Sequence, residues 1–405
     1  MTYDFMNMPE RHGRDALAVD GVGKRPGFAP DAPDSGFDVI PMWVADMNFP
    51  TAPSVITALE ERIRHPLFGY FSPTEEYFSS IIRWQETRHG VTGLTRDCIG
   101  YENGVLGGLV SALNTFCSRG DKVLLHSPTY IGFTSTLQNN GFQIVHSPLR
   151  QDDDGVWRMD YEDMEQKLRE EDIRAVVFCS PHNPCGRVWS REELEYAFAL
   201  FEKYDVKVVS DEIWSDILLS GSRHIPSQMI SSDAAQRTVA LYAPSKTFNL
   251  AGLIGSYHII YNEKLHSRVR KEASLCHYND MNVLSMHALI GAYQPEGAEW
   301  VDELCSVLTG NVRYAVEYIR AHFRGVSVFE PEGTYMLLLN CEQWCREHGH
   351  TLQELEKAAW RVGVAFQDGA MFNAPWSVRV NLALPLCKVR EAMERLDRYV
   401  FNCKQ

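Results

Sequence analysis

The chain has 405 residues, of which 45% are hydrophobic and 23% are charged, and its formal net charge at pH 7 is −14. This length exceeds what one simple core needs and predicts a large domain together with a smaller one. The negative charge argues against nucleic acids and anionic membrane surfaces, whose phosphates would be repelled, and favours a small-molecule ligand.

The cysteines are scattered along the chain and form neither a C-x-x-C pair nor a Cys/His zinc spacing, so no metal site is expected. They are Cys98, Cys117, Cys179, Cys185, Cys276, Cys305, Cys341, Cys345, Cys387 and Cys403. Several lie in apolar runs and indicate core thiols in a reducing compartment. The N-terminus lacks the pattern of a signal peptide, and no later segment approaches a membrane span, so a cytoplasmic location is expected.

The turn-rich stretch at 21–41 predicts an extended arm with little regular structure. The chain then enters the apolar run "VIPMWVADM" at 39–47, so the end of the arm is expected to be packed.

From about residue 100 the pattern becomes a regular alternation of helices and strands. Helices are expected at 103–117 and at 190–205, where Ser190 and Glu193 have the spacing of a capping box. Short apolar strands that end in a turn are expected at 121–130 and 173–186, and further strands at 206–214, 238–246 and 255–262. Nearly continuous apolar strands separated by helices predict an α/β fold with a mostly parallel sheet between two layers of helices.

After about residue 285 the pattern changes to long helices and a compact β/α mixture. We expect a large domain at 50–285, and a smaller α/β domain formed by 286–405 with the N-terminal arm, 1–49. The boundary is expected in the helical segment "NVLSMHALIGAY" at 282–293.

Four of the expected strands end close to residues that can react or bind a ligand, namely Tyr130, Asn183, Asp211 and Lys246. The carboxyl ends of parallel strands meet at one edge of a sheet, where open α/β folds bind their ligands. The sequence therefore predicts that these four side chains share one site.

Their roles fit one cofactor, pyridoxal phosphate. Lys246 is the amine that can form a Schiff base with its aldehyde, and Asp211 is the carboxylate that can keep its pyridine nitrogen protonated. Asn183 can donate to the phenolic oxygen of the ring, and Tyr130 can lie against the ring face.

The cofactor phosphate and the substrate each need a further binding group. The start of the helix at Gly104, Val105 and Leu106 offers free backbone N–H groups and a positive dipole end, and the Ser245 hydroxyl is another donor. Arg379, in a late strand, can bind a substrate carboxylate in bidentate fashion.

Each of these residues also has an ordinary interpretation. Lys246 alone fits a solvated loop lysine, Asp211 a helix N-cap and Asn183 a turn residue. Tyr130 fits a core aromatic residue, and Arg379 the partner of a carboxylate of its own chain. The shared site is favoured because these ordinary roles would have to reproduce the order and spacing of one cofactor site independently.

The chain resembles the fold-type I pyridoxal-phosphate enzymes of the class I/II aminotransferase superfamily, and within it the PatB/MalY-like cystathionine β-lyases, or C–S lyases. The motifs that carry the resemblance run through nearly the whole chain: "MWVADMNFP", "FGYFSPTEEY", "SPTY", "SPHNPCGRVW", "SDEIWSD", "SKTFNLAGL", "EGTYMLLL" and "VRVNLALP". The resemblance implies a mostly parallel seven-stranded sheet in the large domain.

It also implies the same roles for Lys246, Asp211, Asn183, Tyr130 and Arg379 as the residues suggest. Two further positions come from the resemblance alone. Tyr70 matches a tyrosine that reaches into the neighbouring subunit's site, which implies a homodimer with shared active sites, and Ala45 lies in the arm segment that would close over the substrate.

Two positions depart from the pattern of many aminotransferases. Ile254 stands where they carry an arginine for the phosphate, and Trp214 stands where a tyrosine often contacts the cofactor. The first departure, with the "PHNP" turn and "WVADM", favours the lyase subgroup.

The leading functional expectation is α,β-elimination from a sulfur amino acid such as L-cystathionine, with Lys246 as the general base. An amino-acid aminotransferase is the nearest alternative, because it shares the first half of this path. A regulatory role through protein binding on the same fold is a further alternative, whereas a DNA-binding role is disfavoured by the charge.

Overall fold

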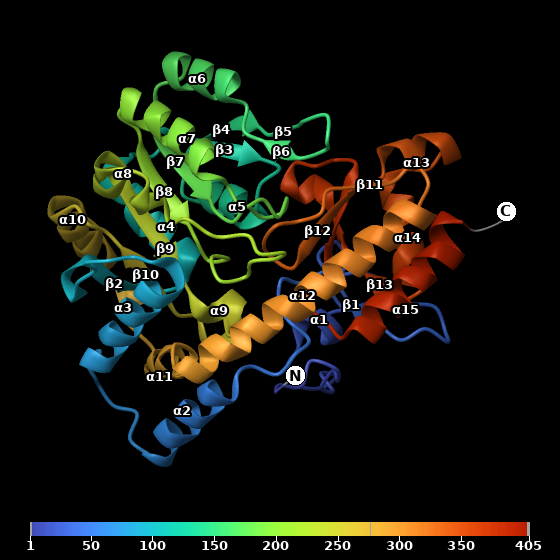
Figure 1. Ribbon diagram of the computed structural model, residues 1–405, viewed down its shortest axis with the longest axis horizontal. Helices are drawn as coiled ribbons and strands as arrows, with labels where there is room; N and C mark the ends of the chain where they lie inside the picture. The colour runs from blue at the N-terminus through green and yellow to red at the C-terminus, as the bar shows by residue number, and fades with distance from the viewer. Residues whose placement is uncertain (1, 276, 403–405) are drawn as a thin grey trace.

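The expected alternation of strands and helices builds a seven-stranded sheet in the first two-thirds of the chain (Figure 1). The computed structural model describes residues 2–275 and 277–402, so Cys276 and Cys403 lie outside the described residues. In spatial order the strands are β2 (Ile99–Glu102), β10 (Ser256–Ile259), β9 (Thr238–Tyr242), β8 (Lys207–Asp211), β7 (Ile173–Cys179), β3 (Lys122–Ser127) and β4 (Gln143–Pro148).

Strands β9, β8, β7, β3 and β4 run parallel to one another, and β10 runs antiparallel to both β9 and β2. The predicted mostly parallel seven-stranded sheet is therefore confirmed. The segment 173–186, expected to be a strand that ends in a turn, is a strand as far as Cys179. Pro181 and Pro184 follow and lack the N–H that a central strand needs.

Alternate residues of the central strands face opposite layers of helices. Phe178 and Val208 pack with α6 and α7 on one face, whereas Val177 and Val209 pack with α4 and α5 on the other. The helices around this sheet are α3 (Glu75–His89), α4 (Val105–Phe116), α5 (Ile131–Asn139), α6 (Tyr161–Glu170), α7 (Arg191–Lys203), α8 (Ser232–Arg237), α9 (Pro244–Thr247) and α10 (Glu263–Ala273). This period-2 division is what a sheet buried on both faces requires.

The capping box predicted for the helix after residue 190 is present at the start of α7. The Glu193 N–H donates to the Ser190 hydroxyl oxygen over 3.2 Å, and the Ser190 N–H donates to the Glu193 carboxylate over 2.8 Å. Two N–H groups that the helix cannot satisfy are thus paired locally, which fixes where α7 begins.

A second sheet follows later in the chain, with antiparallel strands in the order β11 (Ser327–Val328), β12 (Met336–Asn340), β15 (Ser377–Asn381) and β14 (Gln367–Asp368). The long helix α12 (Pro295–His322) runs from the side of α11 (Val283–Ala292) toward this sheet (Figure 1). The N-terminal strand β1 (Ile40–Pro41) pairs in parallel with β13 (Val364–Ala365). The remaining elements are α1 (Leu17–Asp20), α2 (Pro53–Arg64), α13 (Glu342–His348), α14 (Leu352–Arg361), α15 (Leu386–Leu396) and the hairpin of β5 (Arg150–Gln151) with β6 (Trp157–Arg158).

The division into a domain at 50–285 and a smaller one from 1–49 and 286–405 stays a prediction. In the described part of the chain, no helix is both long and apolar enough to cross a membrane. Every cysteine in that part is a free thiol.

Gly291 allows α2 and α11 to pack closely against each other. A Cβ built on Gly291 would lie 2.6 Å from the Ser54 carbonyl oxygen and 2.8 Å from the Ala58 Cβ. We expect Gly291→Ala to push the two helices apart and to lower the free energy of unfolding by about 1–3 kcal/mol, the usual penalty of overpacking. Denaturant unfolding measures this change.

Gly310→Ala is the matched control, because Gly310 also lies within a helix but has open space around its Cα. There the substitution should leave stability unchanged or raise it by up to about 1 kcal/mol through helix propensity. Equal effects at both glycines would contradict the packing argument.

Candidate active site

A cavity of about 210 Å³ lies at the carboxyl edge of the seven-stranded sheet, where β2, β3, β7, β8 and β9 end. The predicted site residues that line it are Ala45, Gly104, Val105, Leu106, Tyr130, Asn183, Asp211, Trp214, Ser245 and Lys246. Segments far apart in the sequence thus meet in one cavity, as the position of the strand ends predicts.

Lys246 enters this cavity from α9, a single helical turn that follows β9 directly. Its Nζ donates to the Ala45 carbonyl oxygen over 2.8 Å and lies 5.8 Å from the centre of the Trp214 ring. Burial lowers the pKa of Lys246 to about 8, Arg379 acts in the same direction, and Asp46 and Asp211 oppose the shift. Lys246 is therefore a half-buried amine that can lose its proton near neutral pH, and the solvated loop lysine is excluded.

Asp211 is the last residue of β8, and its side chain is 5% exposed. One carboxylate oxygen accepts the Ile213 N–H over 3.0 Å. Burial raises the pKa of Asp211 to about 7, although the Ile213 N–H and the Lys246 ammonium favour its charged form. A basic nitrogen of a ligand placed beside this carboxyl would gain a strong partner.

Arg379 lies in the middle of β15 and is 3% exposed. Its guanidinium donates to the Asn183 side-chain oxygen over 3.3 Å, the Trp43 carbonyl over 3.2 Å and the Gln367 side-chain oxygen over 2.6 Å. Its Nε is buried and has no hydrogen-bond partner, and burial lowers its pKa to about 10.

All three acceptors of Arg379 are neutral, and no carboxylate of the described residues forms an ion pair with it. A buried guanidinium without a counter-ion is costly unless an anion binds. The arrangement therefore favours a carboxylate ligand over the internal partner that a strand arginine usually has.

One end of the cavity is formed by the start of α4, the segment that the sequence predicts to bind the phosphate. Gly104 is its N-cap, with a φ of +77°, a conformation that glycine adopts without strain. The N–H groups of the first turn have no partner within the helix, and the helix dipole adds positive potential there. Ser245 lines the same cavity, so its hydroxyl, predicted as a further phosphate donor, also belongs to this cavity.

Tyr130 lines the cavity as the N-cap residue of α5, and Trp214 lines it from the loop after β8. Burial raises the pKa of Tyr130. Tyr70 lies elsewhere: it is fully exposed, in a pocket with Phe68, Tyr101 and Met281. It does not line the cavity of Lys246, and the role that the resemblance implies for it requires a second subunit.

Sequence reasoning missed several residues of the site. Cys179, Ile213, Ala243, Ala251 and Gly255 also line the cavity, and Gln367 holds Arg379. Gln367 faces Arg379 because β14 and β15 pair in that register. A two-residue strand such as β14 has no pattern from which this pairing could be read.

The donors present fit the predicted cofactor. An amine, a buried carboxyl and a turn of free N–H groups line one cavity, which matches the aldehyde, the pyridine nitrogen and the phosphate of pyridoxal phosphate. The buried and unpaired Nε of Arg379 leaves one strong donor for a substrate carboxylate.

Comparisons with known proteins agree with this arrangement. A family model described as "Aminotransferase class I and II" matches residues 38–396. The chain is 31% identical over 396 residues to the cystathionine beta-lyase PatB of Bacillus subtilis (strain 168), covering 97% of this chain and 98% of that protein. It is 30% identical over 404 residues to the protein MalY of Escherichia coli (strain K12), covering 97% of this chain and 98% of that protein.

Among solved structures, the PLP-bound C-S lyase from Staphylococcus hominis superposes with a TM-score of 0.87 at 28% sequence identity, and the match covers 100% of both chains. The fold that the resemblance implied is thereby confirmed over the full length of the chain.

The raised pKa of Asp211 makes a prediction for stability. The pKa is about 7 in the folded chain and 3.8 without burial, so ionisation destabilises the fold progressively between these values. We expect Asp211→Asn to leave the cofactor-free protein roughly 2–4 kcal/mol more stable at pH 8, with a smaller gain at pH 5. Denaturant unfolding at the two pH values measures both.

Asp216→Asn is the control, because Asp216 is equally buried but pairs with His89 over 3.1 Å and has a lowered pKa. A lowered pKa stabilises the fold above the unfolded value, so this variant should lose stability at pH 8. If Asp211→Asn loses stability at pH 8 as well, the carboxyl is not the unfavourable buried charge described above.

Proposed function

Because the chain belongs to the aminotransferase class I and II family, we propose that it is a pyridoxal-phosphate-dependent carbon–sulfur β-lyase. Its substrates are sulfur amino acids such as L-cystathionine, which it splits by α,β-elimination. The observation that carries the proposal is a half-buried amine, Lys246, in one cavity with the buried carboxyl of Asp211. The names of the relatives, a cystathionine beta-lyase and a C-S lyase, support the choice of reaction.

The cofactor-binding residues of this proposal are those of the cavity. The Asp211 carboxylate would hold the pyridine nitrogen and Asn183 the phenolic oxygen, and Tyr130 and Trp214 would pack against the ring. The phosphate would lie at the start of α4, against the N–H groups of Val105 and Leu106 and the hydroxyl of Ser245, whereas the Gly104 N–H already donates to the Glu102 carbonyl over 3.0 Å. When bound, pyridoxal phosphate supplies an electron sink for the pair released at the substrate α-carbon.

The remaining steps belong to side chains of this chain. Arg379 binds the substrate α-carboxylate through its unpaired Nε, which orients the Cα–H bond toward Lys246. Free Lys246, with its pKa near 8, takes the α-proton at Nζ as general base. The Cβ–S bond then breaks, and the sulfur leaves with the bonding pair and is protonated to a thiol.

The reaction is balanced with one water molecule. The three-carbon remainder of the amino acid takes up that water and gives pyruvate and ammonia, so no oxidant or reductant is consumed. Transamination shares the α-proton step but returns the proton to the cofactor carbon and transfers the amino group to a keto acid. An aminotransferase is therefore the second candidate, because Lys246, Asp211 and Arg379 serve both reactions equally well.

The test is a direct assay of the purified protein with L-cystathionine, in which pyruvate and free thiol are followed together. We expect both products in equal amounts, and a visible absorbance band of bound cofactor before substrate is added. Lys246→Ala should lower the turnover rate by at least about a thousandfold, because it removes the base and the amine that holds the cofactor.

Arg379→Gln serves as a second variant, because it removes the charge at the carboxylate site and keeps Lys246. It should raise KM more strongly than it lowers kcat. Amino transfer to a keto acid without pyruvate would assign the chain to the aminotransferases, and bound cofactor without either reaction would favour the regulatory alternative. Absence of the cofactor band would contradict the proposal as a whole.

The active form in this proposal is a homodimer with shared sites. Support comes from the segment after α2, in which Leu67, Phe68, Tyr70 and Phe71 are large hydrophobic side chains exposed together. Exposed apolar clusters of this kind are typical of protein interfaces. In the dimer, Tyr70 reaches the partner's cavity, as the resemblance implies.

Mixing two inactive variants tests the shared sites. Lys246→Ala and Tyr70→Ala remove residues that would belong to the same site but come from different subunits. After subunit exchange, half of the dimers are mixed and each mixed dimer has one intact site, so roughly a quarter of the wild-type activity should return. No recovery in a mixture shown to contain mixed dimers would contradict shared sites.

A cytoplasmic location is part of the same proposal, since the free thiols Cys98, Cys117 and Cys305 suit a reducing compartment. So is the division into a large domain at 50–285 and a smaller one. The antiparallel sheet of β11, β12, β15 and β14, which carries Arg379, supports that division.

A further inference from the structure

Residues 43–47, here termed the strap, cross the site and are held there by side chains. Each of their five backbone carbonyls accepts a hydrogen bond from a side chain. The donors are Arg379 to Trp43 (3.2 Å), Asn381 to Val44 (2.7 Å) and Asp46 (2.6 Å), Lys246 and Tyr335 to Ala45 (2.8 and 3.1 Å), and Asn249 to Met47 (3.0 Å). The strap therefore contacts the lysine and the arginine of the site through its backbone.

The Ala45 carbonyl receives two of these donors, and the Met47 carbonyl also accepts a second, longer hydrogen bond, from Arg11 over 3.4 Å. A carbonyl oxygen has two lone pairs, so the Lys246 ammonium and the Tyr335 hydroxyl can bind it together. Within the described residues, this oxygen is the only hydrogen-bond acceptor of the Lys246 Nζ. The position of the Ala45 carbonyl oxygen thus determines the position of the Lys246 amine.

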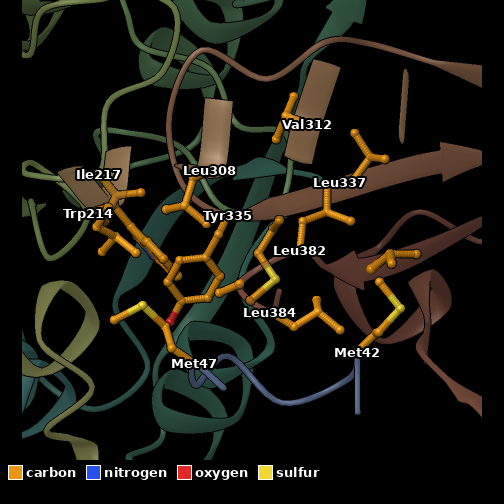
Figure 2. Close-up of a cluster of buried hydrophobic side chains, with 14 of the residues drawn as sticks. Met42, Met47, Trp214, Ile217, Leu308, Val312, Tyr335, Leu337, Leu382 and Leu384 are labelled. Carbon is orange, nitrogen blue, oxygen red and sulfur yellow. The ribbon is translucent and has the colours of Figure 1, made fainter. Parts of the chain in front are cut away.

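Tyr335 is suited to holding that oxygen in place. It is fully buried, and its ring meets the Trp214 ring edge to face with 4.7 Å between the centroids. Figure 2 shows the ring among Trp214, Leu308 and Leu382, with the hydroxyl oxygen pointing toward the part of the strap that carries Met47. A ring packed in this way has little freedom, so its hydroxyl stays at one place.

We propose that Tyr335 is a positioning residue for Lys246: its hydroxyl fixes the Ala45 carbonyl, which in turn holds the free lysine amine in place to act as the base. The inference rests on the proposed function and extends it to a residue outside the cavity. Tyr335 does not line the cavity and acts on Lys246 through the strap alone.

The charges around the amine come from three further elements. Arg379 acts from β15, Asp211 from the end of β8, and Asp46 from the strap itself. Asp46 is paired with Arg11 over 2.5 Å, and this ion pair ties the strap to the N-terminal segment. None of these groups touches the Tyr335 hydroxyl, so removing that hydroxyl changes the Ala45 contact and leaves the charges in place.

The experiment compares Tyr335→Phe with Tyr257→Phe, which removes the hydroxyl of another fully buried tyrosine, one that bonds Gln85 and Tyr293 instead. Full-length protein is stripped of bound aldehyde with hydroxylamine. The free amine of Lys246 is then titrated by competitive acetylation and mass spectrometry. We expect the wild-type midpoint near the pKa of about 8, and a midpoint at least about half a pH unit lower in Tyr335→Phe, because the ammonium loses an ordered acceptor.

Tyr257→Phe should lower thermal stability without moving the midpoint. A Tyr335→Phe midpoint equal to or above that of the wild type would overturn the proposal and leave the hydroxyl a structural role. Because the titration needs neither cofactor nor turnover, its outcome is independent of whether the chain proves to be a lyase.

The loaded enzyme gives a second readout. In Tyr335→Phe, kcat should fall about fivefold to tenfold, the effect of one neutral hydrogen bond, while KM stays within about twofold because Arg379 keeps its partners. A change confined to KM would also overturn the proposal.

Discussion

The Lys246 amine and the Asp211 carboxyl share a cavity that water enters only in part, and the rest of the site is arranged around this constraint. Burial disfavours the charged form of both groups, so it lowers the pKa of the amine to about 8 and raises that of the carboxyl to about 7. An amine near its pKa at neutral pH can exchange a proton with a substrate carbon. A buried carboxyl near its pKa can bind a ring nitrogen more strongly than a solvated one.

The fold holds the Lys246 amine and the Asp211 carboxyl at separate, fixed positions. Asp211 ends β8 and Lys246 follows β9, two adjacent parallel strands whose register pairs Asp211 with Leu241. Two buried carboxylates then link the loop after β8 to the lysine-bearing segment: Glu212 accepts the Tyr242 hydroxyl over 2.7 Å, and Asp216 accepts the Thr247 hydroxyl over 3.2 Å. Each of these carboxylates also contacts a histidine, and its contacts hold its pKa below the ordinary value despite burial, so neither carboxylate is an unfavourable buried charge like that of Asp211.

The sequence predicted the part of the site that depends on strand ends, and it missed the part that depends on tertiary pairing. Tyr130, Asn183, Asp211 and Lys246 were found because the strands before them are continuous apolar runs and parallel strands end at one edge. Tyr335 and Gln367 reach Lys246 and Arg379 through a strap and a strand pair, and nothing in their local sequence indicates those contacts.

The same distinction holds for the fold. The strands β3, β7, β8, β9 and β10 and the start of α7 follow from local patterns, the apolar runs and the capping box at Ser190. The strands β2 and β4 lie outside the segments expected from those patterns, and the total of seven strands was implied by the resemblance alone. The pairing of β1 with β13 joins residues more than three hundred positions apart through two residues of each strand, and no periodicity predicts it. Because the strap directly follows β1, that pairing also decides where the strap begins.

The end of the cavity beside α4, where the proposed phosphate would bind, carries one of the two departures from the aminotransferase pattern that the resemblance indicates. Ile254 has a φ of +52°, a left-handed conformation that a β-branched residue adopts only when its surroundings enforce it. Its side chain lies beside Gly104, and Lys246 is the only basic side chain among the residues that line the cavity. An anion at this end is therefore stabilised by the dipole and N–H groups of α4, without the charge of a guanidinium. In the proposed site the backbone of α4 takes the role that the resemblance assigns to an arginine in many aminotransferases. Gly104 matters to this role because its φ of +77° lets the chain turn sharply into α4.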